Sequence, residues 1–191
     1  MNQTIDKRAL ELHTLLSGMV CTQKNGKGAD FYQLNDCSPA IDLLKIARKK
    51  NANVYLIGNG GSAAIVSHAK TDLMNVGKIK AITLHESAIM TCLSNDYGYE
   101  NVFSRQLEIL ANQDDILIAV SSSGASKNIL NAVTIMQNKY AKVITLSGFE
   151  DSNPLRRMGD LNYWIDSKNY TLVEIAHLFI LHHLADCLKS N

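Results

Sequence analysis

The sequence predicts an α/β protein in which a parallel sheet is covered by helices on both faces. From residue 53 onward, short apolar runs that end in Gly or Ser alternate with longer stretches of helical periodicity. These runs are continuously apolar, which is typical of parallel strands buried on both faces. With 191 residues, 46% of them hydrophobic and 19% charged, the chain is long enough for one domain with a sizeable core.

The first fifty residues are expected to contain two helices separated by a loop. Apolar residues at helical spacing predict an amphipathic helix over residues 3–20. Residues 21–36 lose this period and contain Gly, Asn and Asp, so we predict a loop there. Ser38 and Pro39 begin a second helix that runs to Lys50, with the proline at a first position that needs no N–H.

Residues 51–191 are expected to form the α/β core, and no shift in composition marks a second domain within 1–191. Strands are predicted at residues 54–58, 81–84, 115–121, 142–148 and 162–166. Helices are predicted at residues 62–76, 86–93, 100–112, 126–139, 153–158 and 171–189. Because ligands of such sheets bind outside the carboxyl ends of the strands, the loops at that edge are the expected site.

Charge and cysteine content exclude several classes of protein. The formal net charge is +1, so the sequence predicts no basic face for nucleic acid. The four cysteines lack CxxC spacing and are interpreted as reduced thiols rather than a zinc knuckle or a redox pair. No apolar run approaches the roughly 20 residues of a membrane-spanning helix, and the N-terminus lacks the apolar segment of a signal peptide. A cytoplasmic protein is therefore expected.

Two of the predicted strands lead into small polar loops that each precede a helix. The first loop is Gly58-Asn59-Gly60-Gly61-Ser62-Ala63, and the second is Ser121-Ser122-Ser123-Gly124-Ala125-Ser126. Backbone N–H groups at a helix N-terminus attract anions, and glycine lets a ligand approach the backbone closely. Four serines in six residues add hydroxyl donors without adding charge, which suits a phosphate monoester.

Other interpretations of the first loop stay open. It also matches the dinucleotide pattern G-x-G-x-x-A, with Glu86 after the next strand as a ribose-binding acid. That match would indicate a nucleotide-dependent oxidoreductase. A Walker loop is excluded because no Lys-Ser or Lys-Thr follows the glycines. Glycines after a strand can also simply form a turn.

Two pairs of histidine and acid residues share helix faces. His68 and Asp72 are four residues apart on the helix after the first loop. Glu174 and His182 are eight residues apart on the last helix, a net rotation of about 80° that keeps them on adjoining stripes. Two histidines and two carboxylates suit either a zinc site or general acid–base catalysis. The same spacing is also typical of a solvated helix face, whereas His177, amid apolar residues, is interpreted as a packed histidine.

Four sequence blocks occur in the order and spacing of a known family. They are GNGGS after the first core strand, SNDYGYENVFSRQLE at 94–108, SSSGAS at 121–126, and EIAHLFILHH in the last helix. Together they resemble the sugar isomerase (SIS) domain family, and within it the phosphoheptose isomerase branch, over residues 38–189.

The resemblance implies a three-layer sandwich with a doubly wound, five-stranded parallel sheet of flavodoxin-like or Rossmann-like type. It implies a homotetramer with active sites at subunit interfaces. The implied activity is phosphosugar aldose–ketose isomerisation, from sedoheptulose 7-phosphate to D-glycero-manno-heptose 7-phosphate through an enediol. This is a step toward the heptoses of bacterial lipopolysaccharide and capsule. One zinc ion per subunit is expected, because some members bind zinc.

The resemblance also implies roles for residues by their position. Substrate and phosphate contacts are expected from Asn59, Gly60, Ser62, Asp96, Ser121, Ser122, Ser123, Ser126 and Glu174. Asp72 and His182 are the expected acid–base catalysts, with the choice of base left open. The expected zinc ligands are His68, Asp72, Glu174 and His182, so the two pairs found by spacing coincide with the implied functional set.

The chain departs from the family's pattern at several positions. Asp72 stands where the family usually has Glu, and Glu174 where it usually has Gln. An Arg, an Asn and an Asp that touch sugar or phosphate are replaced by Val76, Ala125 and Thr171. These losses motivate an alternative function, a non-catalytic SIS module that binds a phosphosugar or a protein partner, as in the branch that associates with the bacterial replication initiator.

Overall fold

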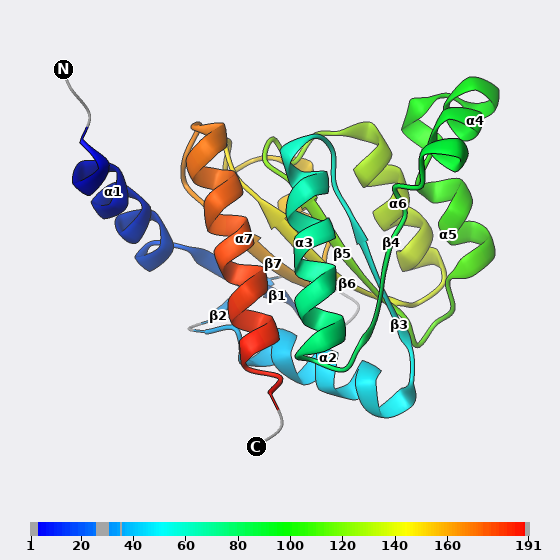
Figure 1. Cartoon of the computed structure of the whole chain (residues 1–191), viewed down its shortest axis with the longest axis horizontal. Helices are drawn as coiled ribbons and strands as arrows, with labels where there is room; N and C mark the ends of the chain where they lie inside the picture. Colours follow the sequence, from blue (N-terminus) through cyan, green and yellow to red (C-terminus); the bar gives the residue numbers. More distant parts are fainter. Residues whose placement is uncertain (1–3, 26–30, 35, 190–191) are drawn as a thin grey trace.

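The computed structural model describes residues 4–25, 31–34 and 36–189, and its sheet lies between two layers of helices (Figure 1). The strands are β1 (Val20–Lys24), β2 (Phe31–Leu34), β3 (Asn53–Ile57), β4 (Lys80–Thr83), β5 (Ile116–Ser121), β6 (Lys142–Ser147) and β7 (Leu161–Trp164). The helices are α1 (Ile5–Ser17), α2 (Ser38–Lys50), α3 (Gly61–Asn75), α4 (Ser87–Tyr97), α5 (Ser104–Leu110), α6 (Lys127–Asn138) and α7 (Tyr170–Asp186), with short turns η1 (Tyr99–Asn101) and η2 (Pro154–Arg157).

The sheet contains the five parallel strands that the sequence predicts. Its strand order is β2-β1-β7-β6-β5-β3-β4, and the strands from β7 to β4 are parallel. From β3 the chain first winds to β4 on one side and then returns to β5 on the other. The winding direction therefore changes between β3 and β5, where ligands of open α/β sheets bind.

The prediction of a loop over residues 21–36 is wrong for the residues that the structure describes. β1 pairs antiparallel with β7, Cys21 lying opposite Tyr163, and β2 pairs antiparallel with β1. The loop signal came largely from residues 26–30, which lie outside the described residues together with residue 35. β1 and β2 are short, and Cys21 is their one buried residue, so tertiary pairing with the edge of the parallel sheet, rather than a buried apolar pattern, makes them strands.

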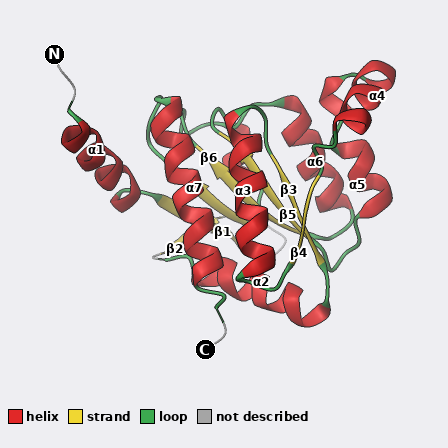
Figure 2. Cartoon of the chain, viewed as in Figure 1, coloured by secondary structure: helices red, strands yellow, loops and turns green. Residues whose placement is uncertain are grey.

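Strand side chains point alternately toward the two helix layers. Leu56 and Ile118 pack in a core cluster with residues of α2, α3 and α7. Tyr55 and Leu117, one position away on the same strands, pack in a second cluster with residues of α5 and α6. Figure 2 shows the strands between these helices. Burial on both faces is the physical reason for the continuous apolar runs in the sequence.

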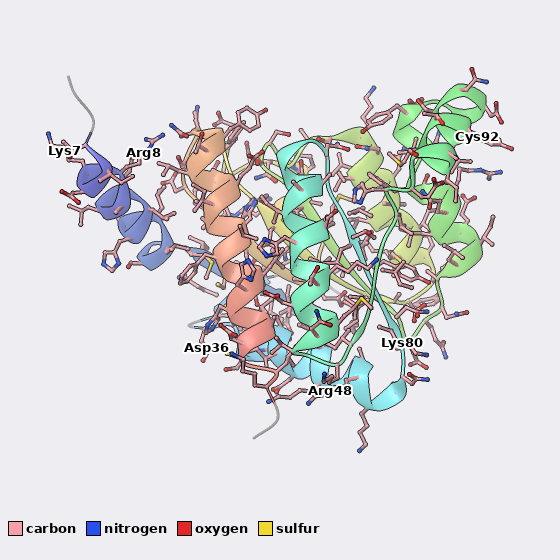
Figure 3. The ribbon with its side chains drawn as sticks, in the orientation of Figure 1. Lys7, Arg8, Asp36, Arg48, Lys80 and Cys92 are labelled. Carbon is pink, nitrogen blue, oxygen red and sulfur yellow. The ribbon has the colours of Figure 1, made fainter. Side chains whose placement is uncertain are left out.

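α3 and α7 lie side by side over one face of the sheet (Figure 1). Below them Arg48 of α2, labelled in Figure 3, donates hydrogen bonds to the carbonyl oxygens of Gly77 at 3.1 Å and Leu188 at 3.0 Å. This side chain ties the ends of both helices to α2. The packing brings the polar stripes of α3 and α7 onto the same surface.

α1 projects from the body of the molecule (Figure 1) and contains no buried residue among those described. The helix predicted over residues 3–20 ends earlier than expected, because Val20 already begins β1. Leu12, Leu15 and Leu16 pack against the core from its last turns, whereas Leu10 is exposed. In the described ranges, none of the helices has the length and apolarity needed to cross a bilayer.

Candidate active site

The glycine-rich loop after β3 brings backbone N–H groups to the carboxyl edge of the sheet. A Cβ on Gly58 would come within 2.7 Å of the Ser62 backbone, and Gly60 has a φ of +52°, so both positions require glycine. α3 begins directly after this turn without a side-chain cap. Its first N–H groups are therefore free to bind a ligand.

The serine loop after β5 folds into a tight turn. Gly124 has a φ of +62°, and its N–H donates to the carbonyl oxygen of Ser121 at 3.0 Å. The Ser121 hydroxyl donates to the Ser126 hydroxyl at 3.3 Å. The Ser122 hydroxyl is buried and has no hydrogen-bond partner in the described part of the chain. A buried hydroxyl without a partner is costly, so this group indicates a bound polar ligand or water.

The two loops meet around one small cavity of about 120 Å³. Its lining residues are Asn59, Ser62, Ser121, Ser122, Ser123, Ser126, Tyr170 and Glu174. This volume is well below the roughly 300–1,000 Å³ of sites that enclose a whole small molecule. The cavity therefore suits one group of a larger ligand, such as a phosphate.

All of these lining residues except Tyr170 were predicted from the sequence as substrate contacts. Tyr170 is the first residue of α7, and its ring packs edge-on against Phe149 with 4.7 Å between ring centroids. The only sequence signal for it is its place just after β7, at the same edge of the sheet. Gly60 is the residue before α3 and does not line the cavity.

The cavity is suited to binding an anion, although no basic side chain among the described residues lines it. Among the described residues, none of those that line it is Lys or Arg. α3 and α6 both begin beside it, and neither has a side-chain cap. Free N–H groups and the positive ends of two helix dipoles therefore supply the attraction. Among the described residues that line the cavity, Glu174 is the one with a formally charged side chain.

Asp72 and His182 form a hydrogen-bonded pair between α3 and α7. Asp72 Oδ2 lies 2.5 Å from His182 Nδ1, and both side chains are 32% exposed. The His68 ring packs edge-on against His182 with 4.7 Å between centroids. A carboxylate and an imidazole in direct contact, open to solvent, can exchange a proton with a ligand.

The four expected zinc ligands do not form one cluster in this structure. Among the residues that the structure describes, no three His, Cys, Asp or Glu side chains are arranged to hold a metal ion. Asp72 Oδ2 and His182 Nδ1 face each other in a direct hydrogen bond. Glu174 lies beside Gly61, at the opposite end of the two helices, where a Cβ on Gly61 would overlap its carboxylate. The arrangement of these four side chains in the structure does not fit a zinc ion. The zinc site therefore rests on the resemblance alone and stays a prediction.

Asp96 lies away from the cavity within this chain. It is exposed on α4, where it accepts hydrogen bonds from Asn95 Nδ2 at 2.9 Å and from the Cys92 thiol at 3.5 Å. Figure 3 labels Cys92 on α4, on the opposite side of the molecule from α7. Asp96 is not among the residues that line the cavity, so its substrate contact stays a prediction from the resemblance.

Glu86, the acid expected in the dinucleotide interpretation, caps α4. Its carboxylate accepts hydrogen bonds from the backbone N–H groups of Ile89 at 2.9 Å and Ala88 at 3.1 Å. These bonds lower the pKa of Glu86. The residue thus has a local structural role that accounts for its position without a ribose.

His177 is a packed histidine, as the sequence suggests. It is fully buried on α7, and its Nε2–H donates to the Ser147 carbonyl oxygen at 3.1 Å. Burial lowers its pKa from the usual 6.5 to about 4.

This burial predicts a pH dependence of stability. Between pH 6.5 and 4 the unfolded chain binds a proton at His177 and the folded chain does not. The contribution of neutral His177 to the free energy of unfolding is therefore complete above pH 6.5. It decreases by about 3 kcal/mol as the pH falls to 4. Urea unfolding at pH 7 and pH 4.5 should show this loss in the unmodified chain and a smaller loss in His177→Gln. His13→Gln, an exposed control on α1, should retain the full loss. Equal losses in the unmodified chain and His177→Gln would contradict the prediction.

Comparison with known proteins gives consistent matches. A family model described as the SIS domain matches residues 33–148. The phosphoheptose isomerase of Cytophaga hutchinsonii is 32% identical, with 100% of this chain and 98% of that protein covered. That of Helicobacter hepaticus is 35% identical, covering 80% of each chain.

Solved structures match as well. The phosphoheptose isomerase of Neisseria gonorrhoeae superposes with a TM-score of 0.75 at 28% identity, over 80% of this chain and 84% of that one. The Francisella tularensis enzyme gives 0.73 at 31% identity, over 82% and 88%.

Proposed function

The chain belongs to the SIS domain family, in its phosphoheptose isomerase branch, and on that premise we propose that it converts sedoheptulose 7-phosphate into D-glycero-manno-heptose 7-phosphate. The observation that carries the proposal is the distance between two groups on α7. Glu174 borders the serine-lined cavity, and His182 belongs to the acid–base pair. The backbone positions of these two residues are eight residues apart, which is a rise of about 12 Å along the axis of α7.

An open-chain heptose 7-phosphate has a matching length. Eight bonds join C1 to the phosphorus, and at the reach of an extended chain they span roughly 9–10 Å. A phosphate in the cavity would therefore place C1 and C2 beside Asp72 and His182. A triose phosphate would be too short to reach both.

The proposed reaction moves one proton between neighbouring carbons. After ring opening, a base removes a proton from C1 of the ketose and a cis-enediol forms. An acid then delivers a proton to C2, while the hydroxyl proton passes from O1 to O2 in the overall exchange of carbonyl and alcohol. Asp72 and His182 share a hydrogen bond of 2.5 Å, so one can accept a proton while the other donates. No step is assigned to a metal.

The first test is a turnover assay with sedoheptulose 7-phosphate. We expect formation of the aldoheptose 7-phosphate and competitive inhibition by inorganic phosphate, because the cavity binds the phosphate group. The assay should be run on the protein as purified, after chelation, and with added zinc, which tests the expected metal dependence separately. Binding of the sugar phosphate without product under all three conditions would contradict an isomerase and favour the non-catalytic module.

The assembly and location rest on the resemblance as well. We propose a cytoplasmic homotetramer with active sites at subunit interfaces. Exposed apolar side chains support contacts between copies, since Ile175 and Phe179 on α7 are 44% and 57% exposed.

A further inference from the structure

Asn59 of the glycine-rich loop is held by a reciprocal pair of side-chain hydrogen bonds. Its Nδ2 donates to Asn128 Oδ1 on α6 at 3.0 Å, and Asn128 Nδ2 donates to Asn59 Oδ1 at 2.8 Å. The Tyr99 hydroxyl, from η1, donates to the same Asn59 oxygen at 3.0 Å. The loop after β3 is thus connected by side chains to α6 and to η1.

The backbone fixes which way both amides point. Asn128 Oδ1 also accepts the backbone N–H of Ile129 at 3.0 Å. A backbone N–H can only donate, so the Asn128 atom facing it must be oxygen. The Asn128 nitrogen then faces Asn59, and the Asn59 atom facing it must in turn be oxygen. Asn128 is only 3% exposed, so solvent does not compete for these bonds.

This orientation leaves Asn59 with a single free polar group. An asparagine amide has two acceptor lone pairs on Oδ1 and two N–H donors on Nδ2. Tyr99 and Asn128 occupy both lone pairs, and Asn128 occupies one N–H. One N–H remains on a residue that lines the cavity. Asn59 can therefore donate to a ligand but cannot accept from it.

We infer that Asn128 and Tyr99 are positioning residues that fix Asn59 as a hydrogen-bond donor to an acceptor oxygen of the bound phosphosugar. The inference rests on the proposed function for the identity of the ligand. A phosphate ester at neutral pH offers mainly acceptor oxygens, and the neighbouring lining groups are hydroxyls that can donate as well. The network selects such a group by excluding a ligand that needs an acceptor at this position.

A double-mutant cycle between Tyr99→Phe and Asn59→Ala tests whether Tyr99 acts through Asn59. Tyr99 is 50% exposed, so the change is not expected to affect folding. In the unmodified chain Tyr99→Phe should lower kcat/KM and raise the Kd of sedoheptulose 7-phosphate about 3- to 10-fold, the value of one hydrogen bond. In the Asn59→Ala background the same change should have less than about a twofold effect. Tyr97→Phe, on a ring that stacks on Arg105, is the matched control and should change neither quantity.

Asn128→Asp provides an independent second arm. The carboxylate still accepts from Ile129 and Asn59 but no longer donates to Asn59 Oδ1. We expect the effect of Asn128→Asp on the Kd of sedoheptulose 7-phosphate to disappear in the Asn59→Ala background as well. Equal effects of either substitution in both backgrounds would overturn the inference, because a merely structural role does not depend on Asn59.

Calorimetric titration with sedoheptulose 7-phosphate and with inorganic phosphate separates this inference from the proposed function. Binding without turnover would refute the isomerase and leave the cycle measurable in Kd. Binding of neither compound would overturn both.

Discussion

A His182→Gln variant is expected to bind sedoheptulose 7-phosphate with a Kd within about threefold of the unmodified chain and to convert it about 10³-fold more slowly. His182 Nδ1 lies 2.5 Å from Asp72 Oδ2, and glutamine supplies no group that gains and loses a proton near neutral pH. Binding should persist because the proposed phosphate position borders Glu174, which lies a rise of about 12 Å from His182 along α7. Single-turnover kinetics and calorimetric titration would measure the two quantities separately.

Two further variants make this test specific. His183→Gln changes the neighbouring histidine, which is exposed and contacts Cys187, and should leave kcat within about twofold. Asp72→Asn should lower kcat as strongly as His182→Gln, and the double variant should be no slower than either one, because the two groups act as a unit. Retention of more than a third of the activity in His182→Gln would refute the role of the pair.

The core elements were predictable because their burial leaves a periodic pattern in the sequence. The runs at 54–58 and 115–121 are β3 and β5, which are buried on both faces. β1 and β2 could not be predicted in this way, since short strands with few buried residues have no such pattern. The pairing of β1 depends on β7, which is more than a hundred residues away in the sequence, and no local propensity contains that information.

The residues of the site likewise divide into those that the sequence could predict and those that it could not. The serine and glycine loops were predictable because small residues between a strand and a helix indicate anion binding at that edge. The contact between Asp72 and His182 followed from helix periodicity combined with the resemblance. Asn128 and Tyr99 were missed because their roles depend on side-chain bonds between separate elements. Asp96 was assigned by position alone, and in this chain its carboxylate contacts Cys92 and Asn95 instead of the cavity.

The conformation of the serine loop requires glycine at position 124, because of both its backbone angle and its close neighbour. Gly124 has a φ of +62°, and a Cβ there would overlap the Asn153 side chain. Asn153 is buried, donates to the carbonyl oxygens of Gly148 at 3.0 Å and Glu150 at 2.8 Å, and accepts the backbone N–H of Arg156 at 3.0 Å. The Gly124 carbonyl also accepts the Leu155 N–H at 3.1 Å. The loop that lines the cavity is thus packed against the segment that follows β6.

Gly124→Ala is therefore expected to reduce the free energy of unfolding by about 3 kcal/mol, from a left-handed backbone cost of about 1–2 kcal/mol and a similar cost of overpacking against Asn153. The Kd for inorganic phosphate should rise by more than about 10²-fold, because the serine hydroxyls and the N-terminus of α6 are displaced together. Gly60→Ala is the matched control for stability: its φ is +52°, yet nothing lies within 4 Å of the added Cβ, so only the backbone cost applies. Urea unfolding should thus rank Gly60→Ala between the unmodified chain and Gly124→Ala. If the two variants lost equal stability, the overlap with Asn153 would not be what requires glycine in the serine loop.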